Sequence, residues 1–391
     1  MISFEQAYEI VLGKARTLGS EEVGIAQALN RILAADVTSD VDMPPFDKSA
    51  MDGYACRRRD LGHELTIVES IPAGYVPEKR IGENQCAKIM TGAMVPPGAD
   101  CVVMMEVTEN PTATTMRFRG EKTADNICFK GEDVRAGEVV LRKGTRLGPE
   151  HIAMLASVGC VSPVVAQRPK VGIIATGDEL VEPAEKPGDS QIRNSNSYQL
   201  SAQVAESGAI PQYYGIAADT ERAIETMLKR AMRECDVILL SGGVSAGDFD
   251  LVPGILKKND IELVFESVAI KPGKPTVFGV SGNVFCFGLP GNPVSTFILF
   301  EVLVKPFLYK MMGHDFKAAT IRAPSGREIV RRRAHRMTWM PVAFTEEGKV
   351  VPVEYHGSAH IQALGSAAGI ISIPAGVDRI EEGTFVHVRQ I

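Results

Sequence analysis

Five short segments of this chain carry residue types that bind anions or transfer protons. The segment 241–250 follows the apolar run 237–240, and its glycines and serines can form a tight loop whose backbone N–H groups converge on an anion. Asp248 and Asp250 place acids at the exit of this loop. The candidate binding residues are Ser241, Gly242, Gly243 and Ser245. The pattern predicts a phosphate cradle; the alternative is an ordinary flexible loop.

Two adjacent carboxylates, Asp178 and Glu179, follow Thr176 and Gly177 at the end of the apolar run 171–175. In proteins Mg²⁺ is held by one or two carboxylates together with substrate phosphates. The segment therefore predicts a magnesium site. The alternative is a helix-capping aspartate beside a solvated glutamate.

Two lysines, Lys271 and Lys274, each precede a proline in the segment 271–275. A residue before proline is confined to extended conformations, so both ammonium groups are presented with little backbone freedom. This arrangement predicts a clamp for phosphate or another oxyanion.

A well-defined helix start follows at 289–295, with a Pro290-Gly291 turn, Asn292 at the N-cap and Pro293 at the first helical position. The alternative is that these residues only begin a helix. Beside two lysines and a glycine loop, however, the free N–H groups of a helix N-terminus form an anion site, which would include Ser295.

The fifth group is scattered over 46–55, 88–93 and 131–133 and contains polar residues among glycines. These segments could line a cleft wall, but taken alone they favour turns.

The elements that must position these residues alternate as strand and helix from about 169 to 318. The predicted strands are 171–175, 211–216, 237–240, 261–270 and 284–287, and the predicted helices are 196–207, 221–234, 252–258 and 293–312. Asn194 or Asn196 caps the first of these helices. The pattern is typical of a parallel-sheet α/β domain, in which ligands bind at the carboxyl ends of the strands.

The rest of the chain divides into three further units. Helices beginning at Phe4, after a Ser3–Gln6 capping box, and covering 25–34 and 148–159 indicate a helical base made of 1–45 and 142–168. Short alternating runs separated by glycine and proline predict an inserted β domain at 46–141 and a C-terminal β domain at 319–391.

Composition restricts the function classes. The 391 residues include 45% apolar and 23% charged residues, which suits a soluble globular protein with several cores. The chain lacks an apolar run of membrane-spanning length and a signal-peptide pattern, and its seven cysteines are scattered, so we expect a cytoplasmic protein without a membrane anchor. The net charge of −6 argues against nucleic-acid binding, and the basic run 327–336 is interpreted as a solvated face, with a polyanion site as the alternative.

Seven segments together resemble the molybdopterin molybdenumtransferases, the MoeA family, which includes the C-terminal domain of gephyrin. In order along the chain they are PFDKSAMDGYA from Pro45, IMTGA from Ile89, GEDV from Gly131, TGDEL from Thr176, SGGVS from Ser241, KPGKP from Lys271 and LPGNPVS from Leu289. The resemblance implies a multidomain α/β and β protein with a helical base, an inserted β domain, a parallel-sheet molybdopterin-binding α/β domain and a C-terminal β barrel.

The resemblance also implies an activity and an assembly. The enzyme would take adenylylated molybdopterin and molybdate, insert the metal at the dithiolene sulfurs and release AMP with the help of Mg²⁺. It would be a homodimer whose cleft lies between the α/β domain of one subunit and the inserted β domain of the other. A transient contact with the protein that makes adenylyl-molybdopterin is a further expectation.

Site roles follow from the resemblance. The catalytic candidates are Asp52, Asp133, Asp178, Glu179, Asp250 and Lys271, and Glu179 and Asp250 are the candidate metal ligands. The candidate substrate-binding residues are Thr91, Thr176, Gly177, Ser241, Gly242, Gly243, Ser245, Lys274, Pro290, Gly291, Asn292, Pro293 and Ser295.

Three departures from the family pattern each remove an expected basic group: Cys128, Ser267 and a position close to Pro341. Two other functions share parts of the pattern. One is a non-catalytic molybdopterin-binding or scaffolding paralogue, which would lose the acids that this chain retains. The other is a nucleotide hydrolase of the competence-damage type, which would not need the inserted β domain.

Overall fold

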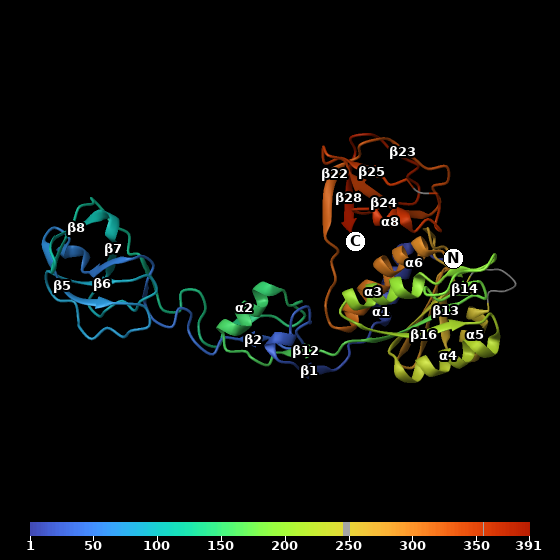
Figure 1. The fold of residues 1–391 in the computed structure, drawn as a ribbon, viewed down its shortest axis with the longest axis horizontal. Coiled ribbons are helices and arrows are strands. Elements are labelled where there is room, and N and C mark those ends of the chain that lie inside the picture. Colours follow the sequence, from blue (N-terminus) through green and yellow to red (C-terminus); the bar gives the residue numbers. More distant parts are fainter. Residues whose placement is uncertain (245–250, 355) are drawn as a thin grey trace.

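The computed structural model describes residues 1–244, 251–354 and 356–391. The molecule is elongated (Figure 1). A β sheet built from residues 53–118 lies at one end, a small helical region lies in the middle, and a sheet covered by helices lies at the other end beside the C-terminal strands. Every helix in the described part of the chain is too short or too polar to cross a bilayer.

The α/β sheet has six strands in the order β16-β13-β17-β21-β20-β18. Their bounds are Ile210–Ala217 (β16), Lys170–Thr176 (β13), Val237–Ser241 (β17), Val284–Leu289 (β21), Val277–Ser281 (β20) and Glu262–Phe265 (β18). The first four strands are parallel, as predicted, and β20 and β18 extend the sheet with antiparallel pairings. The predicted strand 261–270 is split, because Ile270–Lys271 (β19) pairs instead with a strand of the C-terminal sheet.

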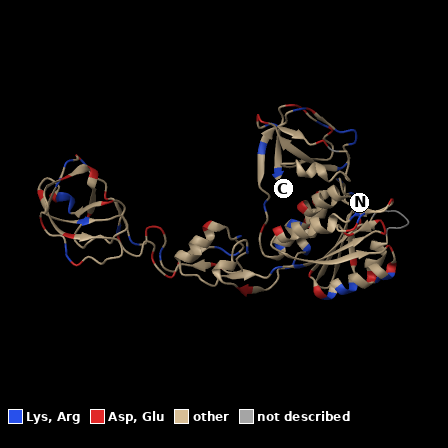
Figure 2. Ribbon diagram, viewed as in Figure 1, with Lys and Arg blue, Asp and Glu red and all other residues tan. Residues whose placement is uncertain are grey.

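Helices cover both faces of this sheet. On one side lie Glu221–Glu234 (α4) and Val252–Lys258 (α5); on the other lie Phe4–Lys14 (α1), Asn196–Glu206 (α3), Pro293–Leu299 (α6) and Lys305–Met311 (α7), with a π-helical segment at Phe300–Val304 between the last two. The buried residues of α4 and α5 are apolar, and the charged residues of these helices lie on their outer sides (Figure 2). At the centre of the second face, Phe307 packs edge to face on three other rings, and two of these pack tilted against each other; the three rings are Phe278, Phe285 and Phe287, and the tilted pair is Phe278 with Phe287.

The helix caps largely follow the sequence. The capping box of Ser3 and Gln6 is present at α1, and the Thr220 side chain accepts from the backbone N–H of Ala223 at α4. At α3 the Asn194 side chain accepts from the backbone N–H of Ser197, which gives Asn194 the capping role. The other candidate, Asn196, is therefore available for another role.

The middle region is built from the residues that precede and follow the segment 46–138 in the chain. Strand pairs join Ser20–Glu22 (β1) to Val164–Ala166 (β12) and Val37–Thr38 (β2) to Val139–Leu141 (β11), and Pro149–Ser157 (α2) packs on them. The predicted helix 25–34 is wrong: only Ile25–Gln27 forms a short 3₁₀ turn. Asn30 has a left-handed backbone (φ 63°), and Leu33 then pairs as extended chain with Val165, so helical hydrogen bonding ends there.

The sheet at the far end has the order β7-β4-β6-β5-β9-β8. Its strands are Cys101–Met104 (β7), Gly53–Cys56 (β4), Gln85–Ile89 (β6), Glu64–Ile71 (β5), Thr115–Phe118 (β9) and Thr108–Thr112 (β8), and Lys48–Ser49 (β3) pairs with Ile127–Cys128 (β10) beside it. Gly53 is required for close packing of β4 on β7, because a Cβ there would lie 2.0 Å from the backbone oxygen of Val103.

The C-terminal sheet has the order β19-β24-β26-β28-β22, with β25 on the side of β24. Its further bounds are Thr320–Pro324 (β22), Met337–Phe344 (β24), Val350–Pro352 (β25), Gly369–Ile373 (β26) and Phe385–Gln390 (β28), with a smaller pair at Ile329–Val330 (β23) and Arg379–Ile380 (β27). The sequence predicts no helix here, but Gln362–Gly365 (α8) is one.

A buried polar cluster joins the C-terminal sheet to the α/β sheet. Glu301, in the π-helical segment, is 2% exposed; it accepts a hydrogen bond of 3.0 Å from Gln203 and lies 3.1 Å from the Lys305 ammonium. Arg389, at the end of β28, donates to the backbone oxygen of Glu301. Because removing one member would leave a buried charge without compensation, this cluster fixes the position of β28 on the helices.

Candidate functional site

A pocket of about 540 Å³ opens at the carboxyl ends of the parallel strands. Thr176 ends β13, Ser241 ends β17, and 291–293 follow β21, so neighbouring strands deliver these residues to one edge. We call this hollow the edge pocket. Its lining includes six predicted residues: Thr176, Glu179, Ser241, Gly291, Asn292 and Pro293.

The wall of the edge pocket is supplied by Asn196, the first residue of α3. Its amide nitrogen donates to the Ser241 hydroxyl and to the backbone oxygen of Gly291, both at 2.8 Å. These bonds fix the amide orientation, because a backbone oxygen only accepts. The Asn196 carbonyl oxygen and the Thr176 hydroxyl are both buried, without a hydrogen-bond partner among the described residues.

Asn194, in the same wall, is fixed by hydrogen bonds to residues outside the pocket lining. Its amide donates to the Tyr213 hydroxyl at 2.8 Å, and Tyr213 donates to the Glu182 carboxylate at 2.6 Å. Burial, reinforced by Glu182, raises the pKa of Tyr213, so the tyrosine keeps its proton and accepts from Asn194. The wall therefore keeps one geometry before any ligand arrives.

The predicted glycines Gly242 and Gly243 follow β17 and allow the backbone there to pass close to Thr176. A Cβ at Gly242 would lie 2.5 Å from the backbone oxygen of Thr176, and one at Gly243 would lie 3.1 Å from the Thr176 hydroxyl. Both glycines have positive φ, as does Gly177. The turn after β17 thus requires glycine for conformation and for space.

A second pocket, of about 560 Å³, lies on the other side of Asn292. Lys271, Lys274, Pro290 and Ser295 line it as predicted, so we call it the lysine pocket. It has a third cation, Arg336, whose guanidinium also donates to the backbone oxygen of Ile270 at 3.3 Å. Three cationic side chains around one hollow favour an oxyanion ligand.

Arg336 corrects two interpretations of the basic run 327–336. This run is not simply a solvated face, since Arg331 donates to the backbone oxygens of Pro374 and Val377 and Arg336 lines the lysine pocket. The family pattern also has a basic group close to Pro341 that this chain lacks at that position, but Arg336 supplies a basic group to the lysine pocket. Composition gave no signal for this role, since it depends on pairing of β19 with β24.

The C-terminal domain closes both pockets through one loop that sequence reasoning missed. Gly357 and Ser358 line the lysine pocket, and Ala359, Ile361 and Gln362 line the edge pocket. The backbone oxygen of Ser358 accepts from the N–H of Val294 in the first turn of α6, at 3.0 Å. A loop without a distinctive motif thus reaches the site only through tertiary packing.

The predicted acids are distributed unevenly. Glu179 lines the edge pocket, whereas the Asp178 carboxylate accepts from the backbone N–H of Asp219 at 3.0 Å. Asp250 and Ser245 lie outside the described residues. Among the residues that are described, no three His, Cys, Asp or Glu side chains gather to hold a metal ion by themselves.

Two of the other predicted residues adjoin the sheet at the far end of the molecule (Figure 1), because Asp52 directly precedes β4 and Thr91 follows β6. The Asp52 carboxylate accepts from the Thr91 backbone N–H at 2.7 Å and from its hydroxyl at 2.8 Å, so these two residues form one unit. Asp133 is exposed on the return segment, where its N–H bonds to the Met43 oxygen. Within one chain, Asp52, Thr91 and Asp133 are therefore not brought to the pockets.

The hydrogen bonds from Thr91, first that of its backbone N–H and then that of its hydroxyl, lower the pKa of Asp52. We expect Thr91→Val, which removes only the hydroxyl, to raise the pKa of Asp52 toward its ordinary value. The stabilisation of the folded form by this carboxylate is present above its unfolded pKa and is lost as the pH falls through the folded pKa, so in the variant that loss moves to higher pH. Carbon-13 NMR titration of the Asp52 carboxyl measures it, with Thr108→Val as the control; an unchanged pKa would contradict the assignment.

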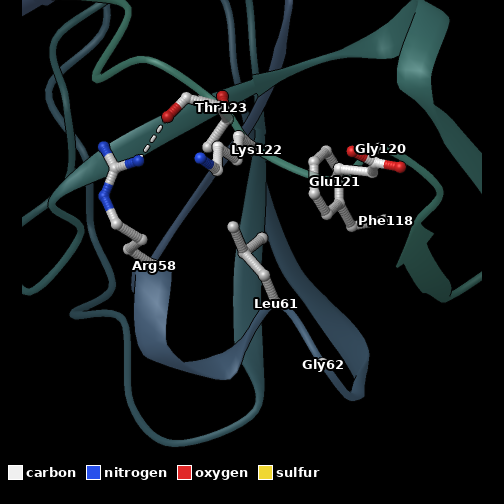
Figure 3. Close-up of a pocket in the computed structure, with 8 residues that line it drawn as sticks. All are labelled: Arg58, Leu61, Gly62, Phe118, Gly120, Glu121, Lys122 and Thr123. Atoms are coloured by element: carbon white, nitrogen blue, oxygen red, sulfur yellow. Dashed lines mark hydrogen bonds between the residues drawn. The ribbon is translucent and has the colours of Figure 1, made fainter.

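A third hollow, of about 430 Å³, lies in the far sheet (Figure 3). Leu61 and Phe118 give it an apolar side, and Arg58 crosses it to donate to the backbone oxygen of Thr123. Its lining comes from 58–62 and 118–123, outside every predicted motif. The predicted binding segments thus line the edge and lysine pockets and not this third hollow.

Three family models together match most of the chain. They are the MoeA N-terminal region (domain I and II) at residues 2–159, the probable molybdopterin binding domain at 172–310, and the MoeA C-terminal region (domain IV) at 326–391. The chain belongs to the MoeA family.

Individual relatives agree with membership in the MoeA family. A protein of Bacillus subtilis (strain 168) named molybdopterin molybdenumtransferase is 36% identical over 383 residues, covering 94% of this chain and 89% of its own length. One of the same name from Staphylococcus epidermidis is 35% identical, covering 99% and 95%. The crystal structure of the molybdopterin biosynthesis moeA protein from Pyrococcus horikoshii OT3 superimposes with a TM-score of 0.87 at 32% identity over all of both chains. These matches confirm the predicted family and fold class.

Proposed function

We propose that this protein is a molybdopterin molybdenumtransferase, which inserts molybdenum from molybdate into adenylylated molybdopterin and releases AMP. The observation that carries the proposal is the pair of pockets that meet at Asn292, one with buried polar groups and one with three cations. Adenylylated molybdopterin combines a hydrogen-bonding heterocycle with phosphates, and molybdate is an oxyanion. The two hollows match these two chemistries. The names of the relatives support the same reaction.

In this proposal Lys271, Lys274 and Arg336 hold the anionic groups of the substrates, and their charge stabilises the negative charge that develops as the phosphoanhydride is cleaved. Ser295 adds a hydroxyl donor in the lysine pocket. The side chains are positioned before binding, because β19 is paired with β24 and the prolines restrict the lysine backbone.

A magnesium ion fits the donor set in part. Glu179 offers a hard carboxylate oxygen in the edge pocket, and Mg²⁺ completes its coordination with water and substrate phosphates when a protein supplies few ligands. Asp250 remains the proposed second ligand. The ion would neutralise phosphate charge there.

The active unit is proposed to be a homodimer. Asp52, Thr91 and Asp133 lie far from the pockets of their own chain (Figure 1), so a second copy must bring them if they act at the cleft. The proposed domain division keeps the predicted bounds, with base 1–45 and 142–168, inserted domain 46–141, α/β domain 169–318 and C-terminal domain 319–391, although α1 packs on the α/β sheet and 139–141 pairs with β2. We further propose a cytoplasmic location, consistent with seven free cysteines, and a transient contact with the enzyme that makes adenylyl-molybdopterin.

The test is a reconstitution of the reaction. We expect the purified protein, given adenylyl-molybdopterin, molybdate and Mg²⁺, to form active cofactor and release AMP. Asp250→Asn should bind the pterin nucleotide and turn over poorly. Binding without AMP release by the unmodified protein would favour the scaffolding paralogue. Hydrolysis of simple nucleotides without molybdate would favour the nucleotide hydrolase.

A further inference from the structure

The edge pocket contains a polar feature that its fold does not need. Asn196 is 9% exposed and Thr176 is 4% exposed, yet the Asn196 carbonyl oxygen and the Thr176 hydroxyl have no partner among the described residues. Burying a polar atom without a hydrogen bond costs about 1–3 kcal/mol. Thr176 and Asn196 both line the edge pocket, so a ligand bound there can satisfy these two atoms.

The hydrogen-bonding capacities of these groups are fixed by their neighbours. Both amide protons of Asn196 are used, on the Ser241 hydroxyl and the Gly291 backbone oxygen, so only its carbonyl oxygen is available, and it can only accept. The Ser241 hydroxyl accepts from Asn196 and therefore keeps its own proton to donate. The Thr176 hydroxyl can donate or accept. This part of the edge pocket thus presents one obligate acceptor, Asn196, beside the Ser241 donor and the Thr176 hydroxyl, which can do either.

We infer that Asn196, with Thr176 and Ser241, recognises the amino-lactam edge of the pterin ring. This edge carries N–H donors next to a carbonyl acceptor, which complements one acceptor flanked by hydroxyls. The inference rests on the proposed function and extends it, because it assigns the heterocycle to the edge pocket and leaves the phosphates to the lysine pocket. Asn196 is then a specificity-determining residue that accepts from the exocyclic amine.

The test compares two commercial probes by isothermal titration calorimetry on the full chain. Pterin carries the 2-amino group, and lumazine has an oxo group at that position. We expect pterin to bind about tenfold more tightly than lumazine, since a site built to accept a hydrogen bond from the exocyclic amine rejects an analogue with an oxo group in its place. AMP at equal concentration should leave pterin bound.

Three variants separate the roles. Asn196→Leu should reduce the pterin-to-lumazine ratio to about one. Thr176→Val, which keeps the shape of the side chain and breaks no hydrogen bond among the described residues, should weaken both probes about tenfold without loss of fold. Ser201→Ala, on the same helix, removes a hydroxyl that bonds only to the Ser197 backbone oxygen and should leave both affinities unchanged.

Each result has a distinct meaning. Equal affinities of the unmodified protein for pterin and lumazine would overturn the inference, as would displacement of pterin by AMP or an unchanged ratio in a folded Asn196→Leu protein. If the inference failed in this way while the reconstituted reaction still released AMP, the proposed function would stand. Loss of the reaction itself, with normal pterin selectivity, would overturn the function and keep the binding assignment.

Discussion

Alanine at both Lys271 and Lys274 is expected to lower kcat/KM for metal insertion about a thousandfold. These lysines are two of the three cations around the lysine pocket, and Arg336 alone would then face the anionic substrate. Removing one preorganised donor to developing negative charge costs on the order of 10²–10³ in rate. Pro272 and Pro275 restrict the backbone of the two lysines before substrate binds, so little binding free energy is lost in ordering this loop.

The measurement is AMP release at several molybdate concentrations, with circular dichroism as a check of fold. Lys229→Ala is the matched control, because this lysine lies on the outer side of α4 in an exposed pair with Glu225 and should change the rate less than twofold. Added salt should weaken substrate binding in the unmodified protein and have less effect in the double variant. A double variant with normal kcat/KM would remove the lysine pocket from the mechanism.

Two inactive variants are expected to restore activity when they are mixed. Asp52→Asn damages the far sheet, and Lys274→Ala damages the lysine pocket at the opposite end of the chain (Figure 1). If each cleft combines these two ends from different subunits, a mixed dimer contains one doubly damaged cleft and one intact cleft. The purified mixed dimer should therefore have about half of the unmodified activity.

The matched control mixes Lys271→Ala with Lys274→Ala. Both changes lie in one pocket of one chain, so every cleft of a mixed dimer stays damaged and no activity should return. Subunits should be exchanged by co-expression with two different tags and purified through both. A doubly tagged dimer without restored activity would show that Asp52 does not act in a cleft shared between subunits.

Local patterns predicted the parts of the fold that local physics controls. The spacing of Ile224, Leu228 and Ala231, with Thr220 as cap, gives α4 with the predicted bounds. The same kind of pattern failed at 25–34, where Leu29 is 48% exposed and Ile32 and Leu33 pack into different cores. A left-handed residue and strand bridges overrode helical spacing there.

The residues of the candidate site likewise include some that local sequence patterns predict and some that they do not. Residues in motifs at strand ends, such as Thr176 and Ser241, were predictable because parallel strands deliver their carboxyl ends to one edge. Arg336 and Ser358 were not, because they reach the pockets through contacts between β19 and β24 and between α6 and the loop 357–362. Asn196 has an ordinary capping signature, and only its hydrogen bonds to Ser241 and Gly291 separate it from Asn194, which is also buried.

The docking of α1 has a consequence for synthesis of the chain. Ala7 and Val11 on α1 are fully buried in the core that contains Phe307 and Leu308 of α7. This partner helix begins about 290 residues after α1 ends, which at roughly 5–20 residues per second takes a ribosome about 15–60 s. The first helix to leave the ribosome is thus among the last to be covered, and its apolar face stays in water while the intervening sheets are made.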